Sequence, residues 1–346
     1  MSQHRAANTV GPILVIGAAG FIGAHVAHRL RSGGHDVVAC DNFNAYYDPE
    51  LKRARVEHLL TSQGVACVRL DIADAAALQR LFDRHRPTHV IHLAAQTGVR
   101  HSITHPQDYV ASNLVGFANV IEAARCSGVA HFVFASSSSV YGARTDAPFT
   151  ETDNTDAPTS FYAATKKANE AMAHAYSQVH GLRCTGLRFF TVYGPWGRPD
   201  MAYFSFAQRL AAGLPLPVFA RGELLRDFTY IDDIVEGVTR LALSPRPGDQ
   251  PLYEIFNIGN HRPVRVLDFI DTLAGLMNVT PTLEFLPMQA GDVPVTCANA
   301  DKLRARVGFE PDTPLQEGLA RFVAWFREWQ RVRSRAAGGR AAVSSS

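Results

Sequence analysis

Three observations predict an α/β fold built on a doubly wound parallel sheet. Short apolar runs alternate with helical patterns through the first half of the chain. These runs are continuously apolar, as expected of strands that are buried on both faces. A glycine-rich loop directly follows the first run and opens the first helical pattern. Strands that alternate with helices in this way pair in parallel through right-handed crossovers.

The individual elements follow from the same patterns. The predicted strands are Ile13–Ile16, Val37–Cys40, Val65–Leu70, His89–Leu93, Phe132–Ala135 and Thr185–Phe190. Helices are predicted on the stripe Ile22, Val26 and Leu30, over Asp74–Arg86, over Asp108–Cys126 and over Tyr162–His180, which ends at Gly181. After Tyr193 proline and glycine interrupt the pattern, and shorter helices are predicted near 201–212, 232–243, 264–277 and 315–330.

This change of pattern divides the chain into two predicted domains. Residues 11–190 form the sheet domain, to which later segments can add a strand and a helix. Residues 191–330 form a smaller C-terminal α/β domain that binds substrate. Residues 331–346, rich in Arg, Ala, Gly and Ser, are predicted to be a disordered tail.

Composition limits the classes of function. Of the 346 residues, 47% are hydrophobic and 19% charged, and the net charge is +2, as in an ordinary globular protein. The sequence has no basic stripe typical of nucleic-acid binding and no apolar run long enough to span a membrane, and no metal site is predicted. The five cysteines form no Cys-x-x-Cys pair and are predicted to be free thiols in a reducing cytoplasm: Cys40, Cys67, Cys126, Cys184 and Cys297.

The glycine-rich loop predicts a dinucleotide site. Gly17, Gly20 and Gly23 stand between a strand and a helix, with Phe21 and Ile22 in the first helical turn. Glycines at these positions allow a tight turn and a close approach of the backbone to a pyrophosphate, which the helix N-terminus then stabilises. The sheet is therefore expected to be of the Rossmann type.

Asp41 indicates which dinucleotide is bound. It ends the second strand 24 residues after Gly17, where a carboxylate accepts from the adenosine ribose and repels a 2′-phosphate. Because Asn42 and the two residues after it supply no arginine for such a phosphate, NAD is predicted rather than NADP. A loop-initiating Asp-Asn turn is the alternative for Asp41. Asp71, followed by Ile72, either meets the adenine or caps the next helix.

Tyr162 and Lys166 form the candidate catalytic pair. Residues four apart lie on one face of a helix, and an ammonium near a phenol favours the phenolate, which lowers the tyrosine pKa from its usual value of about 10. A tyrosine tuned in this way can take a proton from a sugar hydroxyl. The same spacing also occurs on ordinary solvated helices, so the pair has to be weighed with the other motifs.

Several longer strings complete the pattern. They are Asp41-Asn42 through Tyr46-Tyr47-Asp48-Pro49, residues 92–100 (HLAAQTGVR), 135–142 (ASSSSVYG), 187–195 (LRFFTVYGP) and 226–233 (RDFTYIDD). Together with Gly17–Gly23, Tyr162 and Lys166, they resemble the extended short-chain dehydrogenase/reductase family of the NAD-dependent epimerase/dehydratase type. The resemblance covers residues 11–330 and is strongest to the branch that acts on UDP-glucuronate.

The resemblance implies three roles beside the nicotinamide. Tyr162 would be the base, Lys166 would bind the nicotinamide ribose and lower the tyrosine pKa, and Ser137 would hydrogen-bond the reacting hydroxyl. For Ser137 the alternative is an ordinary polar loop with local backbone bonds. Four further residues fall where relatives contact the cofactor: Leu93, Ala94, Ala95 and Phe189. For Phe189 a place in the core is an equal alternative.

The resemblance also implies the reaction, an NAD-dependent and reversible C4′ epimerisation of UDP-glucuronate to UDP-galacturonate through a 4-keto sugar. Relatives that dehydrate or decarboxylate their substrate carry acids where this chain has Ser138 and Ser139. The keto sugar is a β-keto acid, which loses carbon dioxide unless its carboxylate is held out of alignment with the carbonyl. The candidates to hold it are Ser138, Ser139 and Thr191, with Arg198 ranked below them.

The uridine diphosphate half of the substrate maps onto four residues of the second domain. In relatives the matching residues clamp the pyrophosphate (Arg226), bond the uridine ribose (Asp292) and flank the uracil (Val218 and Phe219). An arginine suits a diphosphate because its planar fork binds in a bidentate way. The alternative for Arg226 is an ion pair with Asp227 or Asp232.

Some questions stay open at this level. Relatives that act on UDP-galactose carry a cofactor-contacting lysine aligned near Thr97, whereas this chain has no lysine between residues 53 and 165, so the strength of NAD retention is open. One alternative activity is UDP-glucose/UDP-galactose 4-epimerisation, which Thr191 disfavours. Another is a non-catalytic NAD-binding sensor, which the retained Tyr162 and Lys166 disfavour. Members of the family usually dimerise through a four-helix bundle, so a homodimer through helices 108–126 and 162–180 is expected.

Overall fold

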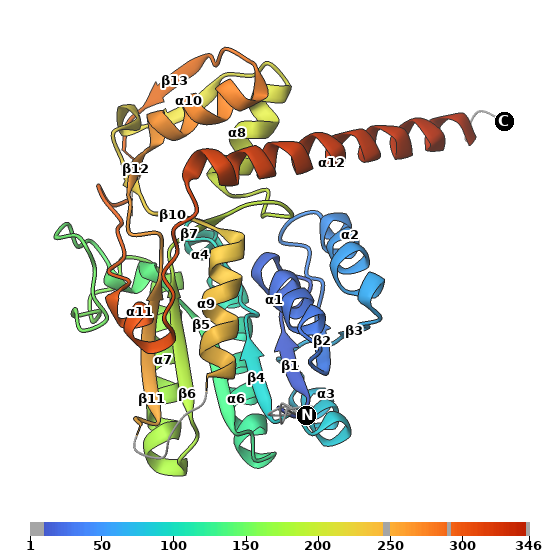
Figure 1. The fold of residues 1–346 in the computed structure, drawn as a ribbon, viewed down its shortest axis with the longest axis vertical. Coiled ribbons are helices and arrows are strands. Elements are labelled where there is room, and N and C mark those ends of the chain that lie inside the picture. The colour runs from blue at the N-terminus through green and yellow to red at the C-terminus, as the bar shows by residue number, and fades with distance from the viewer. Residues whose placement is uncertain (1–9, 245–249, 289–291, 344–346) are drawn as a thin grey trace, which may run out of the picture.

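One seven-stranded parallel sheet forms the centre of the computed structural model, which describes residues 10–244, 250–288 and 292–343 (Figure 1). The strand order is β11–β6–β5–β4–β1–β2–β3. The strands are β1 (Ile13–Ile16), β2 (Val37–Asp41), β3 (Cys67–Arg69), β4 (His89–His92), β5 (His131–Ser137), β6 (Cys184–Phe189) and β11 (Tyr253–Ile258). The order reverses between β1 and β4, which is the predicted doubly wound topology, and ligands bind at such a switch point.

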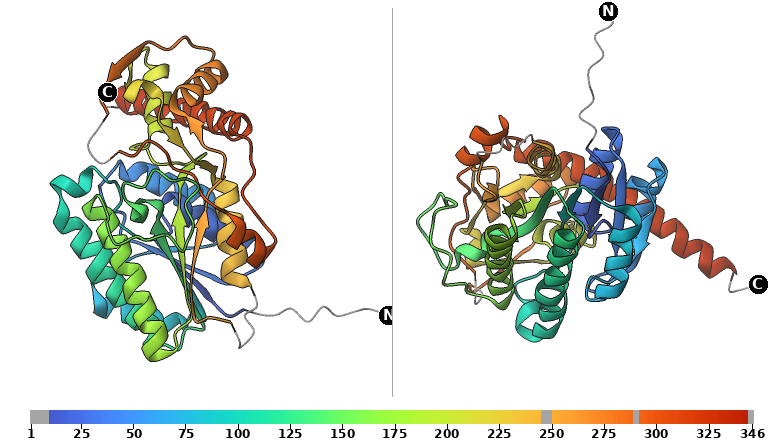
Figure 2. Two further views of the ribbon diagram at one scale, coloured as in Figure 1. Left: turned by 90° about the vertical axis from the view of Figure 1, so that its left-hand side faces the viewer. Right: turned by 90° about the horizontal axis from the view of Figure 1, so that it is seen from below.

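Different helices cover the two faces of the sheet. Helices α1 (Phe21–Ser32) and α9 (Ile231–Leu243) pack together on one face, whereas α3 (Ala75–His85), α6 (Phe117–Cys126) and α7 (Phe161–His180) lie on the other (Figure 2). Strand β1 contributes to both cores in alternation. Ile13 and Val15 join the core beneath α1 and α9, and Leu14 and Ile16 join the opposite one. Burial on both sides explains why the strand is continuously apolar.

A second layer stands over the carboxyl ends of the strands. It contains α8 (Ala202–Ala211), α10 (Val266–Met277), α12 (Leu315–Val343) and three strand pairs: β7 (Thr191–Tyr193) with β10 (Phe228–Tyr230), β8 (Leu216–Phe219) with β13 (Leu283–Leu286), and β9 (Leu225–Arg226) with β12 (Val264–Arg265). The other helices are α2 (Pro49–Leu59), α4 (His101–Thr104), α5 (Pro106–Tyr109) and α11 (Asp301–Val307). Short 3₁₀ or π turns are η1 (Thr61–Gln63), η2 (Val110–Gly116), η3 (Ser138–Tyr141) and η4 (Ala220–Gly222).

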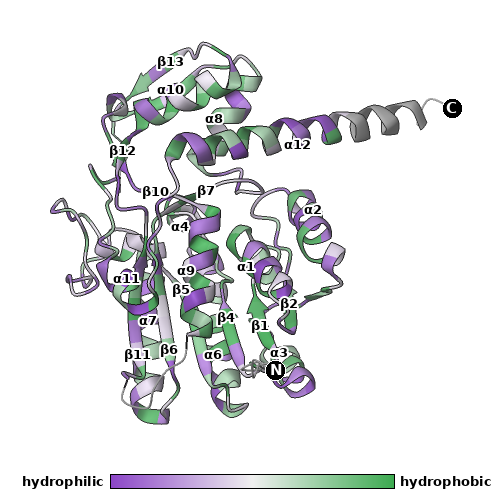
Figure 3. Cartoon of the chain, viewed as in Figure 1, coloured by the Kyte–Doolittle hydropathy of each residue, from purple (hydrophilic) through white to green (hydrophobic). Residues whose placement is uncertain are grey.

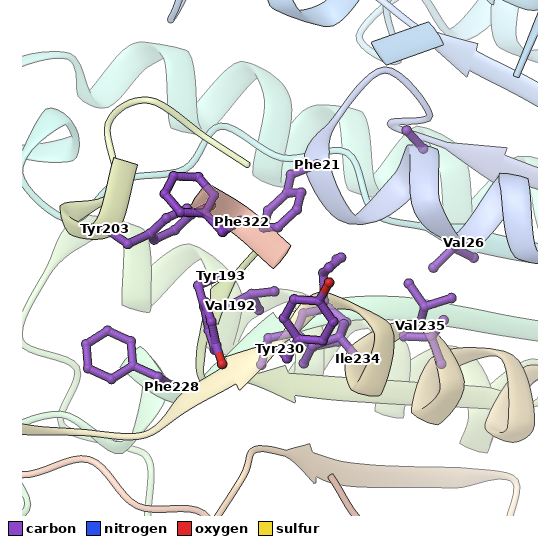
Figure 4. Close-up of a cluster of buried hydrophobic side chains, with 14 of the residues drawn as sticks. Phe21, Val26, Val192, Tyr193, Tyr203, Phe228, Tyr230, Ile234, Val235 and Phe322 are labelled. Carbon is purple, nitrogen blue, oxygen red and sulfur yellow. The ribbon is translucent and has the colours of Figure 1, made fainter. Parts of the chain in front are cut away.

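A continuous apolar cluster joins this second layer to the sheet domain (Figure 4). The Tyr193 ring of β7 lies 5.6 Å from the Tyr230 ring of β10, and the Tyr203 ring of α8 lies 5.1 Å from the Phe322 ring of α12. Phe21, at the start of α1, belongs to the same cluster. Figure 3 shows apolar strands in the sheet and helices with one apolar and one polar side. The shared core therefore fixes the second layer over the edge where the glycine loop lies.

The helix predicted over Asp108–Cys126 is not one regular helix. After α5 the chain forms the π turn η2, and only then the regular helix α6. Asn113 of η2 accepts from the Gln96 N–H at 2.8 Å and donates to the Gln96 carbonyl at 3.0 Å. The wider turn thus holds the loop that follows β4, in keeping with the frequent use of π turns at functional sites.

Two further predictions differ from the structure at the ends of elements. The strand predicted at Val65–Leu70 is only Cys67–Arg69, because β3 is the edge strand of the sheet and Val68 is 38% exposed. The disordered tail predicted at 331–346 is instead helical through Val343, since arginine and alanine are strong helix formers. Arg333 pairs with Asp48 at 3.0 Å, so this extension also touches the start of α2. Among the described helices, none has both the length and the apolarity needed to cross a bilayer.

Candidate active site

The glycine loop is a close-packed turn between β1 and α1. Gly17 has φ of +85°, and a Cβ at this position would lie 2.5 Å from the Ala94 nitrogen. A Cβ at Gly23 would clash with the Gly17 carbonyl oxygen. Helix α1 starts after Gly20 with no side-chain cap and no acidic residue in its first turn. Its N–H groups and its positive end are therefore free to bind an anion, so the cradle fits the pyrophosphate of a dinucleotide.

Asp41 ties this loop to the segment after β2. Its carboxylate accepts from the Ala19 N–H at 3.0 Å and from the Phe43 N–H at 2.8 Å. The Asp-Asn turn weighed as an alternative is thus present, and the carboxylate oxygens keep acceptor capacity for the ribose hydroxyls. The Asn42 side chain donates to Asp71 at 3.0 Å, which brings these two predicted cofactor residues together.

Three of the remaining predicted cofactor positions also lie at this edge. Leu93 follows β4 and donates its N–H to the Ile16 carbonyl at 2.8 Å, and Ala94 and Ala95 continue into the loop beside Gly17. Ile72 is buried, with its side chain against Gly116 of the π turn. Any contact of Ile72 with a nucleotide therefore has to come from its backbone.

The predicted catalytic residues converge at the carboxyl ends of β5 and β6. Tyr162 lies in the first turn of α7, which Ser160 caps by accepting from the Ala163 N–H at 3.1 Å. Ser137 ends β5 and stands in register with Phe189 of β6. Turn η3, which follows Ser137, packs against α7. The fold thus brings a tyrosine, a serine and an aromatic ring to one place.

The electrostatics of Tyr162 differ from the expectation. Burial raises the pKa of Tyr162, while hydrogen bonding to Ser137 and the positive charge of Arg198 oppose the rise. Burial lowers the pKa of Lys166 to about 8, and the charge of Glu170 partly opposes this. The Lys166 ammonium donates to the Ala135 carbonyl at 2.8 Å. The net direction for the tyrosine is opposite to the predicted one, and Arg198 is the cation that lowers its pKa.

A buried ion pair fixes the base of this site. Glu170, one turn after Lys166, accepts two N–H groups of Arg188 on β6, each at 2.9 Å, and the Ser136 hydroxyl at 2.6 Å. Glu170 and Arg188 are each 4% exposed. The pair ties α7 to β5 and β6 one residue from Ser137. It also occupies the Glu170 carboxylate, which excludes this group as a free base.

Two of the hydroxyl-bearing candidates for a sugar carboxylate lie in the turn after Ser137, and the third lies two residues after Phe189. Ser138 and Ser139 form the first half of η3, and the Ser137 hydroxyl donates to that of Ser139 at 3.1 Å. Thr191 begins β7, directly after the strand that carries Phe189. Arg198 forms a bidentate pair with Asp200, with one N–H to oxygen distance of 3.1 Å.

Arg226 and Asp292 meet across the second layer, with 3.8 Å between Nη2 and Oδ1. The alternative partners proposed for Arg226 are wrong. Asp227 is fully buried and binds backbone N–H groups, and Asp232 pairs with Arg321 at 3.2 Å. Residues 289–291, which precede Asp292 in its motif, lie outside the described residues.

The two residues predicted beside the uracil differ in accessibility. Phe219 is partly exposed, and the guanidinium of Arg100 lies 5.5 Å from the centre of its ring. Val218 is fully buried in the core. Because β8 alternates its side chains, only the backbone of Val218 can face a base, whereas the Phe219 ring can stack on one.

Two buried basic residues of α2 were not predicted. Arg55, with no exposed surface, donates to the carbonyls of Ala19 and Trp196 and so links the glycine loop to the turn after β7. Lys52 is 5% exposed and donates to Asn44. The stretch Leu51–Leu59 is charge-rich and looks solvent-facing. The one signal in the sequence is that positions 52 and 55 share a helix face with the apolar Leu59.

Comparisons with known proteins agree with this geometry. Residues 13–259 match the NAD dependent epimerase/dehydratase family. The chain is 47% identical to UDP-glucuronate 4-epimerase 1 of Arabidopsis thaliana over 94% of this chain and 78% of the plant protein, and 42% identical to Protein CapI of Staphylococcus aureus over 92% and 99%. A solved structure of UDP-glucuronic acid 4-epimerase from Bacillus cereus, in complex with UDP-glucuronic acid and NAD, is similar with a TM-score of 0.84 and 32% identity, covering 92% of this chain and 99% of that one. The chain therefore belongs to the NAD-dependent epimerase/dehydratase family.

Proposed function

We propose that this chain catalyses the reversible C4′ epimerisation of UDP-glucuronate to UDP-galacturonate. The observation that carries the proposal is the run Ser137, Ser138 and Ser139 packed against the helix of Tyr162. A base is present, and hydroxyls stand where dehydrating and decarboxylating relatives have acids. The names of the plant and Bacillus relatives support the same substrate.

NAD bound at this site would supply the hydride acceptor for C4′ and the hydride that reduces the keto sugar from its opposite face. Tyr162 takes the proton of the C4′ hydroxyl while Ser137 orients that hydroxyl. Because burial opposes ionisation of Tyr162, the hydrogen bond from Ser137 and, after it, the charge of Arg198 are the groups that favour the phenolate. Lys166 holds the ribose of the cofactor. Without an acid at 138 or 139 to remove the C5′ proton, returning the hydride is the available outcome.

The carboxylate is the group by which the enzyme can distinguish a uronate substrate from a neutral sugar. Hydroxyls of Ser138, Ser139 and Thr191 can donate to it without placing a second charge beside the developing ketone. Such bonds fix the torsion about the C5′–C6′ bond and keep the breaking bond out of line with the carbonyl. Arg226 and Asp292 hold the uridine diphosphate end, and Phe219 offers a ring to the uracil.

Incubation of the purified protein with UDP-glucuronate, followed by proton NMR of the sugar signals, tests this function. Appearance of UDP-galacturonate to an equilibrium mixture is the expected result. Accumulation of a UDP-pentose would identify a decarboxylase. Conversion of UDP-glucose but not of UDP-glucuronate would identify the neutral-sugar epimerase, and no turnover of either sugar would leave a non-catalytic NAD-binding protein.

The proposal includes a homodimer in the cytoplasm. The outer side of α7 carries an apolar stripe at three- and four-residue spacing: Phe161, Ala164, Ala168, Ala171, Ala175 and Val179. Val179 is 73% exposed, and Val115 of the neighbouring η2 turn is 47% exposed. Two such helix pairs can pack as a four-helix bundle. The cysteines are free thiols, which supports a reducing compartment.

A further inference from the structure

Lys52 is a buried cation with neutral partners. Its ammonium donates to the backbone carbonyl of Asn44 at 2.9 Å and to the side-chain oxygen of Asn44 at 2.6 Å. These bonds use two of the three N–H groups of an ammonium. The side chain is 5% exposed, and burial lowers the Lys52 pKa even though the charge of Asp41 opposes this, so the cost of burying the ammonium is only partly offset within the protein. This arrangement is suited to an anion that arrives with a ligand.

A second polar side chain, that of Gln96, lies close to Lys52 through Asn44. The Asn44 amide donates to the Gln96 side-chain oxygen at 3.2 Å, which joins Lys52 to the loop after β4. Gln96 is 4% exposed, and among the described residues its side-chain nitrogen makes no hydrogen bond of ordinary geometry, although it lies close enough to the Tyr109 hydroxyl to oppose the rise in the Tyr109 pKa. A buried N–H that is satisfied so weakly is uncommon in folded proteins. Lys52 and Gln96 thus offer donors from two sides of Asn44.

The position of Lys52 indicates which anion this is. One turn further along α2, Arg55 donates to the Ala19 carbonyl of the glycine loop, so this face of the helix looks onto that loop. The charge of Asp41, whose carboxylate holds the Ala19 N–H, acts on Lys52. The Tyr47 ring lies 4.8 Å from the Lys52 ammonium and limits its movement. These neighbours belong to the cofactor end of the site, whereas Arg226, proposed for the diphosphate of the substrate, lies in the second layer. The position of Lys52 therefore favours an anion of the cofactor.

We propose that Lys52 and the Gln96 amide bind the diphosphate of NAD, together with the N-terminus of α1. Lys52 would thereby supply a positive charge to the cofactor from α2, whereas the cofactor-contacting lysine of relatives that act on UDP-galactose aligns with the loop after β4. This inference rests on the use of NAD and is independent of which sugar is epimerised.

Binding measurements on stripped protein test the assignment. Lys52→Gln removes the charge, Lys52→Arg keeps it, and Arg53→Gln removes an exposed charge from the adjacent position of the same helix. Titration calorimetry with NAD, adenosine and UDP separates the ligands, because adenosine lacks the diphosphate and UDP carries the diphosphate of the substrate. A charge-assisted hydrogen bond corresponds to roughly a ten- to hundredfold change in affinity.

We expect Lys52→Gln to weaken NAD binding about tenfold or more, with adenosine and UDP affinities unchanged. Lys52→Arg should retain most of the NAD affinity, and Arg53→Gln should match the unmodified protein. Equal loss of NAD and adenosine affinity, loss of UDP affinity instead, or no change in any of them would each overturn the assignment.

Gln96→Glu covers the case in which Lys52→Gln does not fold. This isosteric change keeps the oxygen that accepts from Asn44 and replaces the N–H donor by a second carboxylate oxygen. It should weaken NAD binding, and thermal unfolding without ligand reports separately whether the variant keeps its fold. Unchanged NAD affinity would contradict the proposal. NMR turnover assays at saturating NAD keep the epimerase proposal separate, since it can hold with either outcome.

Discussion

Tyr162 works in surroundings that oppose its ionisation. Its pKa is raised by burial, and the groups that counter this are the Ser137 hydroxyl and the Arg198 cation. Arg198 is itself paired with Asp200, so its effect on Tyr162 is only partial. Within the protein, therefore, burial outweighs the two groups that favour the phenolate, and the pKa of Tyr162 stays above its usual value.

Thr191 is the residue at which we expect product identity to change. Thr191→Ala removes one of the donors proposed for the sugar carboxylate, which should allow the 4-keto acid to rotate into the geometry that releases carbon dioxide. A UDP-pentose should then appear beside UDP-galacturonate in NMR spectra of the reaction. Thr191→Ser, which keeps the hydroxyl, is the matched control and should form no pentose. An alanine variant with unchanged turnover and no pentose would rule out the restraint.

His92 makes folding stability depend on pH. Burial, and to a smaller extent the charge of Lys166, lowers its pKa from 6.5 to about 3, so the folded state keeps this ring neutral. Between pH 6.5 and about 3 the unfolded chain binds a proton that the folded chain does not, and stability is lost as the pH falls through this window, by about 1.4 kcal/mol per pH unit.

Urea unfolding at pH 7 and at pH 4.5 measures this slope. His92→Phe, which packs with the neighbouring rings of Phe117 and Phe132, should lose less stability on acidification than the unmodified protein. His180→Gln changes an exposed residue at the end of α7 and should leave the slope unchanged. Parallel slopes for all three proteins would show that His92 is not responsible.

At the scale of elements, α7 is held against β5 and β6 by the pair of Glu170 and Arg188. Glu170→Gln leaves the Arg188 guanidinium buried without its carboxylate, and such a loss costs about 3–5 kcal/mol. The double change Glu170→Leu with Arg188→Met removes both charges and should recover much of that stability. Chemical denaturation of the unmodified protein, Glu170→Gln, the double variant and its two single changes, Glu170→Leu and Arg188→Met, gives the comparison. A double variant as unstable as the sum of its two single changes would contradict a charge-pair origin.

The elements themselves could largely be predicted from sequence, because burial on both faces leaves a continuous apolar run. The prediction for Ile13–Ile16 is confirmed residue for residue. The exceptions have physical causes. The π turn of η2 arises from a tertiary bond of Asn113 to Gln96, and Cys67–Arg69 is short because it is an edge. No periodicity encodes either effect.

The candidate site, too, could be predicted from the sequence only in part. Gly17, Asp41, Tyr162 and Ser137 are brought to one edge as their motifs predicted, because each stands at the end of a strand or the start of a helix. Lys52 and Arg55 could not be found in this way. Their burial comes from carbonyl groups of segments distant in sequence, such as Ala19 and Trp196, and a charged helix face carries no mark of such partners.

At the scale of the whole molecule, the described part of the chain holds the entire proposed site, so a dimer would stabilise the site rather than complete it. Helix α7 explains how. Its inner face carries Lys166 and Glu170, and its outer face carries the alanine stripe, so a second copy that packs on this stripe clamps the catalytic helix from outside. Assembly and thermal stability should therefore change together.

Ala171→Arg tests this coupling, because Ala171 lies exposed in the middle of the stripe and arginine is compatible with a helix. Within a dimer the new side chains would meet at the bundle interface, where like charges repel each other and the burial of a charge is costly. We expect light scattering coupled to size-exclusion chromatography to give twice the monomer mass for the unmodified chain and the monomer mass for the variant, which should also melt at a lower temperature. Ala320→Arg, at an exposed position of α12, is the control and should remain dimeric. An unmodified chain that elutes as a monomer, or an Ala171→Arg variant that stays dimeric, would place the interface elsewhere or exclude it.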